Sequence, residues 1–212
     1  MSNTSLRGLY AITPDAPLPI ATLVDQVGAA IAGGARVIQY RDKIHERDER
    51  RQRAAALLAC CRAAGVPLIV NDDLDLAVEL GADGVHLGRD DPDPRAARER
   101  LGETAIIGVS CYDQLALAEA AAAAGASYVA FGSFFPSTTK PKAVRPDPGL
   151  LTEARRRIAL PLVAIGGITP HNGGPLIAAG ADMLAVVTGV FAQADITAAA
   201  RAYTNLFPKE TH

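Results

Sequence analysis

The sequence predicts a closed (β/α)8 barrel, the TIM-barrel fold, in one domain that spans residues 1–212. The first observation is a repeated junction: a helical stretch ends in Gly-Ala and an apolar strand follows, at Gly34, Gly81, Gly125 and Gly180. The second is that one more strand fits between successive junctions, which makes eight alternations of strand and helix. An open doubly wound sheet is the alternative, but no G-x-G-x-x-G motif follows the first predicted strand.

The eight predicted strands are short apolar runs, as expected for parallel strands that are buried on both faces. They cover Gly8–Thr13, Arg36–Arg41, Leu68–Asn71, Gly84–Leu87, Ile106–Ser110, Tyr128–Gly132, Leu162–Ile165 and Met183–Val187. The predicted helices cover Ile20–Gly33, Asp48–Ala64, Leu74–Leu80, Pro94–Leu101, Asp113–Ala124, Gly149–Ile158, Asn172–Ala179 and Asp195–Leu206. In such a barrel the functional groups lie on the loops after the strands, so a site is expected among those loops.

Composition narrows the classes of function. A net charge of −2 does not favour capture of nucleic acid or of an anionic membrane. No apolar run approaches the roughly 20 residues of a membrane span, and the N-terminus lacks the pattern of a signal peptide. The three cysteines have no metal-ligand spacing, and their odd number argues against a disulfide framework. We therefore expect a cytoplasmic protein that acts on small molecules. The sequence is compatible with a monomer and with a homo-oligomer.

Acidic residues follow two successive predicted strands. Asn71, Asp72 and Asp73 end the third strand, and Asp91 follows the fourth. If these strands are parallel neighbours, Asp72 and Asp91 face the same rim, and one or two carboxylates plus substrate phosphates are the ligands that Mg²⁺ prefers. The alternatives are helix N-capping by Asp72 or Asp73, and a simple turn before Pro92.

The second predicted strand ends in Gln39-Tyr40-Arg41-Asp42-Lys43. Alternation along a strand places Gln39, Arg41 and Lys43 on one side, and two cations with an amide suit an anionic substrate. The alternative is a solvated strand end in which Arg41 pairs with a neighbouring carboxylate.

Ser110 ends the fifth predicted strand and has a hydroxyl that could bind a phosphate; the alternative is an N-cap or a local turn. Cys111 has no nearby histidine in the sequence to activate it, so it is not predicted to be a nucleophile. His86 lies inside the fourth strand, where a satisfied interior histidine is favoured over a catalytic one.

Two further stretches favour phosphate binding. The longest loop, Ser133–Lys142, follows the sixth strand; its Ser137, Thr138, Thr139 and Lys140 could form a phosphate clamp or merely an exposed polar tip. Gly166-Gly167 after the seventh strand and Thr188-Gly189 after the eighth suit a phosphate held by backbone N–H groups. Together with the acidic pair, these loops predict an enzyme that joins a diphosphate to a monophosphate, with Mg²⁺ assisting the departure of pyrophosphate.

The chain resembles the thiamine-phosphate synthase family over nearly its full length. The motifs that carry the resemblance are VIQYRDK (Val37–Lys43), LIVNDDLDLAVELGADGVHLGRDD (Leu68–Asp91), IGVSC (Ile107–Cys111), FGSFFPSTTK (Phe131–Lys140) and AIGGIT (Ala164–Thr169). The resemblance implies a (β/α)8 barrel. It also implies coupling of 4-amino-2-methyl-5-hydroxymethylpyrimidine diphosphate to 4-methyl-5-(2-hydroxyethyl)thiazole phosphate, with one Mg²⁺ ion per subunit and a pyrimidine carbocation on the path.

The resemblance also implies roles for individual residues. The pyrimidine diphosphate would be held by Gln39, Arg41, Lys43, Asn71, Ser110 and Lys140, of which Arg41, Lys43, Ser110 and Lys140 are the expected catalytic groups. Asp72 and Asp91 would bind Mg²⁺. The substrate-binding surface would be completed by Tyr40, Asp42, Ser137, Thr138, Thr139, Gly167, Val187 and Thr188.

Four positions depart from the usual family pattern: Tyr40, Arg89, Ser137 and Thr188 stand where leucine, glutamine, threonine and serine are common. The hydroxyl exchanges preserve hydrogen bonding, and Tyr40 is expected to pack away from Gln39 and Arg41. Arg89 either perturbs the metal site or extends the grip on phosphate.

Three other functions are alternatives to the synthase reaction. A related thiazole tautomerase relies on a histidine after the fifth strand, where this chain reads Ser110-Cys111-Tyr112. A non-catalytic regulatory barrel has no use for leaving-group machinery, and a sugar-phosphate isomerase does not require the Asp72–Asp91 pair.

Overall fold

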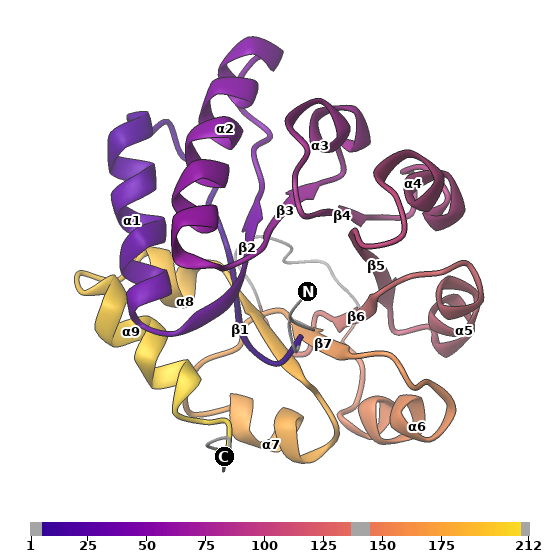
Figure 1. The fold of residues 1–212 in the computed structure, drawn as a ribbon. Coiled ribbons are helices and arrows are strands. Elements are labelled where there is room, and N and C mark those ends of the chain that lie inside the picture. The colour runs from indigo at the N-terminus through magenta and orange to yellow at the C-terminus, as the bar shows by residue number, and fades with distance from the viewer. Residues whose placement is uncertain (1–5, 137–144, 209–212) are drawn as a thin grey trace.

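The computed structural model of this chain describes residues 6–136 and 145–208. Eight parallel strands form a closed barrel in sequence order, and β8 closes the ring on β1 (Figure 1). The strands are β1 Gly8–Ile12, β2 Ala35–Tyr40, β3 Leu68–Asn71, β4 Gly84–Leu87, β5 Ile106–Tyr112, β6 Tyr128–Gly132, β7 Leu162–Ile165 and β8 Met183–Val186. The predicted barrel is confirmed, and the open sheet is wrong.

The helices form a layer around the barrel: α1 to α7 each lie between two successive strands, and α8 and α9 follow β8 (Figure 1). They are α1 Ile20–Ala32, α2 Arg47–Ala64, α3 Leu74–Leu80, α4 Pro94–Leu101, α5 Leu115–Ala123, α6 Gly149–Arg157, α7 Gly173–Ala178, α8 Thr188–Phe191 and α9 Ile196–Thr204. The short α8 is not predicted from the sequence. It begins directly after β8, so the eighth strand ends one residue earlier than predicted, and Val187 becomes the residue that precedes the helix.

The element boundaries also differ after β5. This strand continues two residues beyond its predicted end, with an irregularity in its pairing with β6 between Ser110 and Tyr112. The Gln114 N–H then donates to the Cys111 carbonyl over 2.9 Å. Because that turn uses Asp113 and Gln114, α5 begins at Leu115.

Side chains fill the inside of the barrel. One buried cluster there contains Tyr10, Ile12, Val37, Ile69, Tyr128, Ala130, Val163, Met183 and Ala185, and a larger cluster lies between the strands and the helices. Gly108 makes room for the Tyr128 ring, because a Cβ at position 108 would lie 2.0 Å from Tyr128 Cζ. The barrel is therefore a packed core rather than a channel, and any site must lie at one of its ends.

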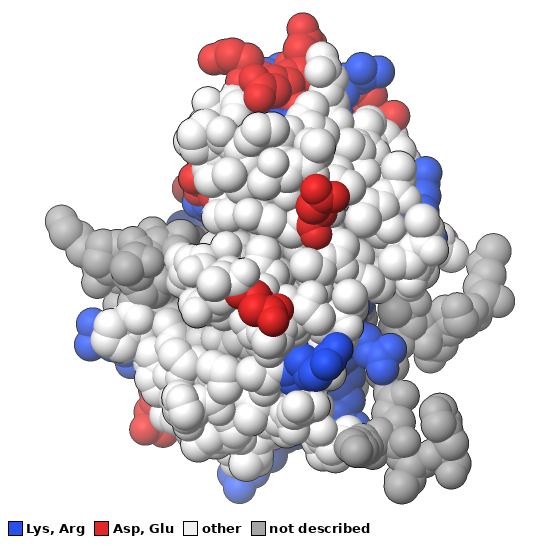
Figure 2. All heavy atoms as spheres, turned by 90° about the vertical axis from the view of Figure 1, so that its left-hand side faces the viewer, with Lys and Arg blue, Asp and Glu red and all other residues white. Residues whose placement is uncertain are grey.

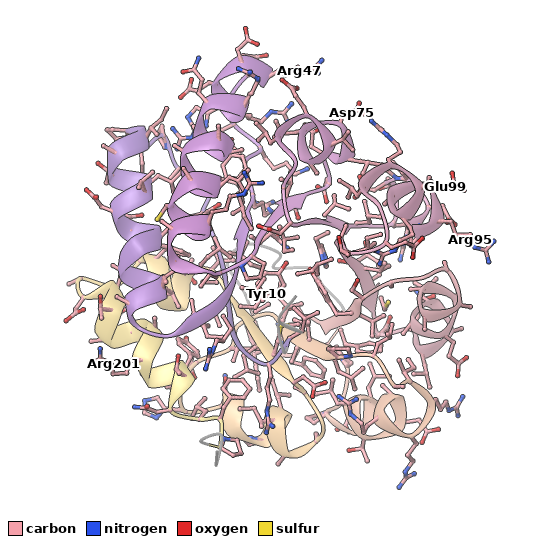
Figure 3. All side chains as sticks on the ribbon, viewed as in Figure 1. Tyr10, Arg47, Asp75, Arg95, Glu99 and Arg201 are labelled. Atoms are coloured by element: carbon pink, nitrogen blue, oxygen red, sulfur yellow. The ribbon has the colours of Figure 1, made fainter. Side chains whose placement is uncertain are left out.

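The outer surface is that of the helical layer. In Figure 3, Tyr10 lies at the centre of the barrel, whereas Arg47, Glu99 and Arg201 project from the outer helices. Figure 2 shows the side formed by α1 and its neighbours, where charged side chains are sparse across the middle, in keeping with Asp25 being the only charged residue of α1.

Among the described residues, no helix combines the length and apolarity needed to cross a bilayer.

Candidate active site

The acidic pair is brought together at the C-terminal rim of the barrel. Asp72 directly follows β3, with its backbone in the left-handed region at a φ of 62°. Asp91 lies in the loop after β4, where its Oδ2 accepts a 2.6 Å hydrogen bond from the Gly88 N–H. The two carboxyl groups are close enough for the charge of each to affect the other. The predicted juxtaposition of Asp72 and Asp91 therefore exists, and Asp73, not Asp72, is the N-cap of α3.

The two acids respond differently to this proximity. Burial raises the pKa of Asp72, but the hydrogen bond from Lys43 and the interaction with Asp91 outweigh it, so that its pKa lies below the usual value. Burial also raises the pKa of Asp91, and repulsion from the Asp72 carboxylate keeps it raised despite the Gly88 N–H. Such opposite shifts are the behaviour of two carboxyl groups that lie close together.

The donor set at this rim fits Mg²⁺. Two adjacent carboxylates repel each other when both are ionised, and a divalent cation between them removes that repulsion. Within residues 6–136 and 145–208, no cluster of three or more His, Cys, Asp or Glu residues is arranged around one metal position. A two-carboxylate site leaves most of the coordination sphere to water and substrate phosphates, which suits Mg²⁺ better than a metal that needs a full protein cage.

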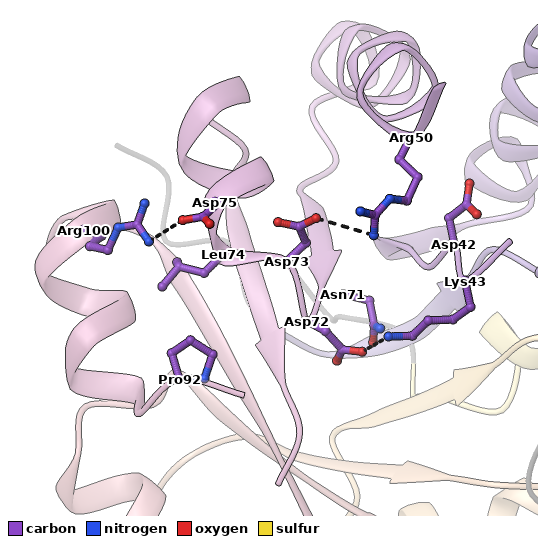
Figure 4. Close-up of a pocket in the computed structure, with 10 residues that line it drawn as sticks. All are labelled: Asp42, Lys43, Arg50, Asn71, Asp72, Asp73, Leu74, Asp75, Pro92 and Arg100. Carbon is purple, nitrogen blue, oxygen red and sulfur yellow. Dashed lines mark hydrogen bonds and ion pairs between the residues drawn. The ribbon is translucent and has the colours of Figure 1, made fainter. Parts of the chain in front are cut away.

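Lys43 lies over the same rim. Its Nζ is 2.5 Å from Asp72 Oδ2, and the Lys43 side chain is half exposed. In Figure 4 the Lys43 and Asp72 side chains extend toward each other beside Asn71. The ammonium group therefore neutralises the ionised acid and remains within reach of a ligand that binds there.

A cavity of about 390 Å³ opens beside this ion pair. Sequence reasoning missed two cations that line it: Arg50 of α2, 3.6 Å from Asp73, and Arg100 of α4, 2.7 Å from Asp75 (Figure 4). Both lie on helices, so a search confined to the loops after the strands passes over them. The lining residues are Asp42, Lys43, Arg50, Asn71, Asp72, Asp73, Leu74, Asp75, Pro92 and Arg100.

The other cation of the β2 end is paired differently. β2 ends at Tyr40, so strand alternation does not extend to Arg41 and Lys43. The Arg41 guanidinium pairs with Asp15 of the preceding loop, and Asp15 Oδ1 also accepts from the Lys43 backbone N–H over 2.9 Å. Pairing with a neighbouring carboxylate was the alternative interpretation for Arg41, and the structure has this pair.

Tyr40 and Asp42 support the same loop. Tyr40 is 3% exposed, as expected for a packed residue, and its hydroxyl donates to Asp42 Oδ2 over 2.7 Å. The Asp42 carboxylate also accepts from the backbone N–H groups of Ile44 and His45, each over 3.1 Å. Burial raises the pKa of Asp42, but these donors outweigh it and keep the pKa below normal. Asp42 thus lines the cavity as an ionised anchor of the loop.

Gln39, Ser110 and His86 point into the barrel mouth from three strands. Gln39 is 3% exposed. Ser110 Oγ lies 2.9 Å from His86 Nε2, so the alternative interpretation of Ser110 as a cap of the following helix is wrong. His86 is a hydrogen-bonded interior residue, as favoured from the sequence. Cys111 is buried, and burial raises the pKa of its thiol to about 12, which agrees with an inert cysteine.

The ends of β7 and β8 adjoin each other, because these strands are paired. Gly166 and Gly167 both have a positive φ, and a Cβ on Gly167 would lie 2.2 Å from the Pro136 carbonyl oxygen. The start of the β6 loop is docked here, with the Phe135 N–H donating to the Gly166 carbonyl over 3.0 Å. Val187 and Thr188 stand at the start of α8. The predicted clamp residues Ser137, Thr138, Thr139 and Lys140 lie outside the described residues.

Arg89, the least expected residue of the rim, lies over the Tyr112 ring, with its Cζ 4.8 Å from the ring centroid. Tyr112 has a φ of 57°, which is rare for a residue other than glycine. Arg89 makes no ion pair with any residue in the described part of the chain.

Comparison with known proteins agrees with this geometry. Residues 9–190 match the family described as thiamine monophosphate synthase. The thiamine-phosphate synthase of Thiobacillus denitrificans is 55% identical over 203 residues, 96% of each chain. That of Nitrosococcus oceani is 52% identical over 206 residues, 97% of this chain and 95% of the relative.

Solved structures lead to the same family. A thiamine phosphate pyrophosphorylase from Pyrococcus furiosus superimposes with a TM-score of 0.85 at 31% identity, covering 97% of both chains. A 3-hexulose-6-phosphate synthase shares the fold alone, with a TM-score of 0.69 at 18% identity. Sequence identity over almost the whole chain and the residues gathered at the barrel rim lead to one conclusion: this chain belongs to the thiamine monophosphate synthase family.

Proposed function

We propose that this protein transfers the 4-amino-2-methylpyrimidin-5-ylmethyl group from its diphosphate to the nitrogen of 4-methyl-5-(2-hydroxyethyl)thiazole phosphate, releasing pyrophosphate and forming thiamine phosphate. The observation that carries the proposal is the mutual electrostatic effect of Asp72 and Asp91 beside Lys43 at the C-terminal rim. Two neighbouring carboxylates can hold a divalent cation, and the ammonium group beside them can face phosphate oxygens. Together they suit a metal-bound diphosphate. The family membership supports the same reaction.

The proposed reaction is dissociative. The bond between the pyrimidine methylene carbon and the diphosphate oxygen breaks, and its electron pair leaves with pyrophosphate. The thiazole nitrogen then donates its lone pair to the carbocation to form the new C–N bond. No protein nucleophile takes part, in keeping with the raised pKa of the Cys111 thiol.

Each group of the rim has a proposed task. Asp72 and Asp91 would hold one Mg²⁺ ion, which when bound supplies positive charge to the departing diphosphate. Lys43 and Arg41 add positive charge from the loop after β2, and Asn71, Ser110 and Gln39 provide hydrogen bonds. To bind the diphosphate, the Lys43 ammonium group would exchange its present partner, the Asp72 carboxylate, for a phosphate oxygen. The thiazole phosphate is assigned to Gly167, Val187 and Thr188 at the ends of β7 and β8, with Ser137, Thr138 and Thr139.

The experiment that tests the proposal measures pyrophosphate release with both substrates, with and without Mg²⁺, and with each substrate omitted in turn. Release that requires Mg²⁺ and both substrates supports the coupling reaction. Absence of release, together with tight binding of a thiazole phosphate, would move the protein to the tautomerase or regulatory function. Tyr112 stands in the region where the tautomerase relies on a histidine, so isomerisation of the thiazole is not expected.

We expect Lys140→Ala to lower kcat by about 10²-fold or more, with a smaller effect on the KM for the thiazole phosphate. The reason is that loss of a cation aimed at developing negative charge costs transition-state stabilisation of this order. Steady-state kinetics with each substrate varied in turn measures the two effects, and Lys142→Ala in the same loop is the matched control. An effect limited to the KM for the thiazole phosphate would assign Lys140 to the other substrate.

A further inference from the structure

Five polar side chains from five different strands form one continuous chain of hydrogen bonds across the barrel. Gln39 Nε2 donates to the Tyr10 hydroxyl over 2.7 Å, and the Tyr10 and Tyr128 hydroxyl oxygens are 2.7 Å apart. Tyr128 is 2.9 Å from His86 Nδ1, and His86 Nε2 is 2.9 Å from Ser110 Oγ. The chain therefore links Gln39 on β2 with Ser110 on β5, two groups to which the proposed reaction assigns substrate contacts.

The middle of this chain is closed to solvent. Tyr10 is 1% exposed, Tyr128 is 0% exposed and Gln39 is 3% exposed. Burial raises the pKa of both phenols well above the usual value, so each tyrosine is neutral and carries one proton. A neutral hydroxyl donates one hydrogen bond and accepts from others, so each link in such a chain constrains the next.

The direction of every link follows from the first. An amide nitrogen only donates, so Tyr10 accepts from Gln39, and Tyr128 is the one acceptor among the described residues for the Tyr10 proton. Tyr128 has then accepted from Tyr10, and its own proton goes to His86 Nδ1. A neutral imidazole that accepts at Nδ1 carries its proton on Nε2 and donates it to Ser110 Oγ.

The two ends of the chain consequently differ in polarity. The Ser110 oxygen is occupied by the His86 donor, and its hydroxyl proton has no acceptor among the residues that the structure describes. At the other end, Gln39 Oε1 has no hydrogen-bond donor in residues 6–136 and 145–208. The barrel mouth thus offers a directed O–H donor on β5 and a carbonyl acceptor on β2.

We infer that Tyr10, Tyr128 and His86 are positioning residues whose fixed proton order commits Ser110 to donate its hydrogen bond to an oxygen of the bound diphosphate. The inference rests on the proposed function for the identity of the ligand. Tyr128 is the decisive member, because without its proton the imidazole is free to place a proton on Nδ1. Ser110 could then turn its hydroxyl proton back toward His86 Nε2 and present a lone pair to the anion.

The proton order is tested without substrate or turnover. In ¹⁵N-labelled protein at neutral pH, long-range ¹H–¹⁵N correlations should show His86 with its proton on Nε2 and Nδ1 unprotonated. Tyr128→Phe should shift the tautomer toward a proton on Nδ1. Tyr10→Phe is the comparison: it removes the same atom from an equally buried ring, and with it the link that orients Tyr128. His86 Nδ1 remains the one acceptor for the Tyr128 proton among the described residues, so the tautomer should shift less than in Tyr128→Phe. A proton on His86 Nδ1 in the unaltered protein would overturn the inference.

The consequence for binding is tested with inorganic pyrophosphate and Mg²⁺ in a calorimetric titration. Ser110→Ala should weaken pyrophosphate about tenfold or more, the range for one hydrogen bond to a charged group. Tyr128→Phe should weaken it less, and should add nothing in the Ser110→Ala background because it acts through Ser110. If the losses of pyrophosphate affinity in Ser110→Ala and Tyr128→Phe add up in the double variant, Tyr128 acts on the ligand independently of Ser110. That result would overturn the positioning role.

The inference and the proposed function fail in different ways. If the unaltered protein bound no pyrophosphate with Mg²⁺ and released none from the two substrates, the proposed function would fall. A wrong His86 tautomer or additive losses, in a protein that shows normal Mg²⁺-dependent pyrophosphate release, would overturn the inference alone.

Discussion

Asp72→Asn should reduce Mg²⁺-dependent pyrophosphate release by about 10³-fold or more while the protein still folds. The lost carboxylate charge removes one of the two proposed protein ligands of Mg²⁺, and metal stabilisation of a leaving group amounts to several kcal/mol. Asparagine is the informative replacement, because Asp72 has a φ of 62° and asparagine tolerates that conformation whereas alanine is strained there. Asp72→Ala should also abolish turnover, with some loss of stability.

The matched control for Asp72→Asn is the same exchange one residue later. Asp73 caps α3, where its Oδ1 accepts from the Leu76 N–H over 2.9 Å, and asparagine retains that acceptor. Asp73→Asn should therefore keep most of the activity. Rates are measured over a range of Mg²⁺ concentrations, and folding is checked by thermal unfolding. Full activity of Asp72→Asn would remove Asp72 from the metal site.

Where a local sequence pattern defines an element, the predicted limits of that element match the structure to the residue. The strands Leu68–Asn71 and Gly84–Leu87 and the helix Leu74–Leu80 have the predicted limits. Apolar runs and terminal glycines specify such elements without reference to the rest of the chain. The helix Thr188–Phe191 was not predicted, because four residues are about one helical turn and are too short to show a helical period.

Part of the candidate site could be predicted from local sequence patterns, and part could not. Asp72 and Asp91 could be predicted to meet, because neighbouring parallel strands deliver their following residues to one rim. The hydrogen-bond chain through the barrel could not, since Tyr10 and Tyr128 are 118 positions apart and sequence alternation does not show which interior side chains touch. Asp15, the partner of Arg41, lies in the preceding loop, for which no pattern exists.

The second large effect is expected from Arg53→Ala, which should lower the free energy of unfolding by about 3–5 kcal/mol, the cost of leaving one partner of a buried ion pair alone. The Arg53 and Asp42 side chains are 3% and 5% exposed, with Nε 3.4 Å from Oδ2. Arg53 also donates to the carbonyl oxygens of Leu18, over 2.6 Å, and Ala16, over 3.4 Å. Truncation removes the buried guanidinium charge that faces the Asp42 carboxylate and leaves two carbonyl groups without this donor.

Chemical denaturation of the variant measures this loss, and Arg51→Ala serves as the control. Arg51 lies on the same helix and pairs with Glu79 over 2.6 Å, but the two side chains are 54% and 38% exposed. A surface pair of this kind contributes at most about 1 kcal/mol. Equal losses in Arg53→Ala and Arg51→Ala would contradict the prediction. Asp42→Asn in the Arg53→Ala background should recover part of the stability, because it removes the buried carboxylate charge that the guanidinium faced.

The position of Arg53 connects this stability to the proposed chemistry. Arg53 joins the loop before α1, through Ala16 and Leu18, to Asp42 in the loop after β2. Asp42 lies between the two cations Arg41 and Lys43, both held by Asp15. A buried guanidinium on α2 therefore fixes the loop that carries the rim cations. At temperatures where Arg53→Ala remains folded, its kcat should fall as well, while Arg51→Ala should keep the rate of the unaltered protein.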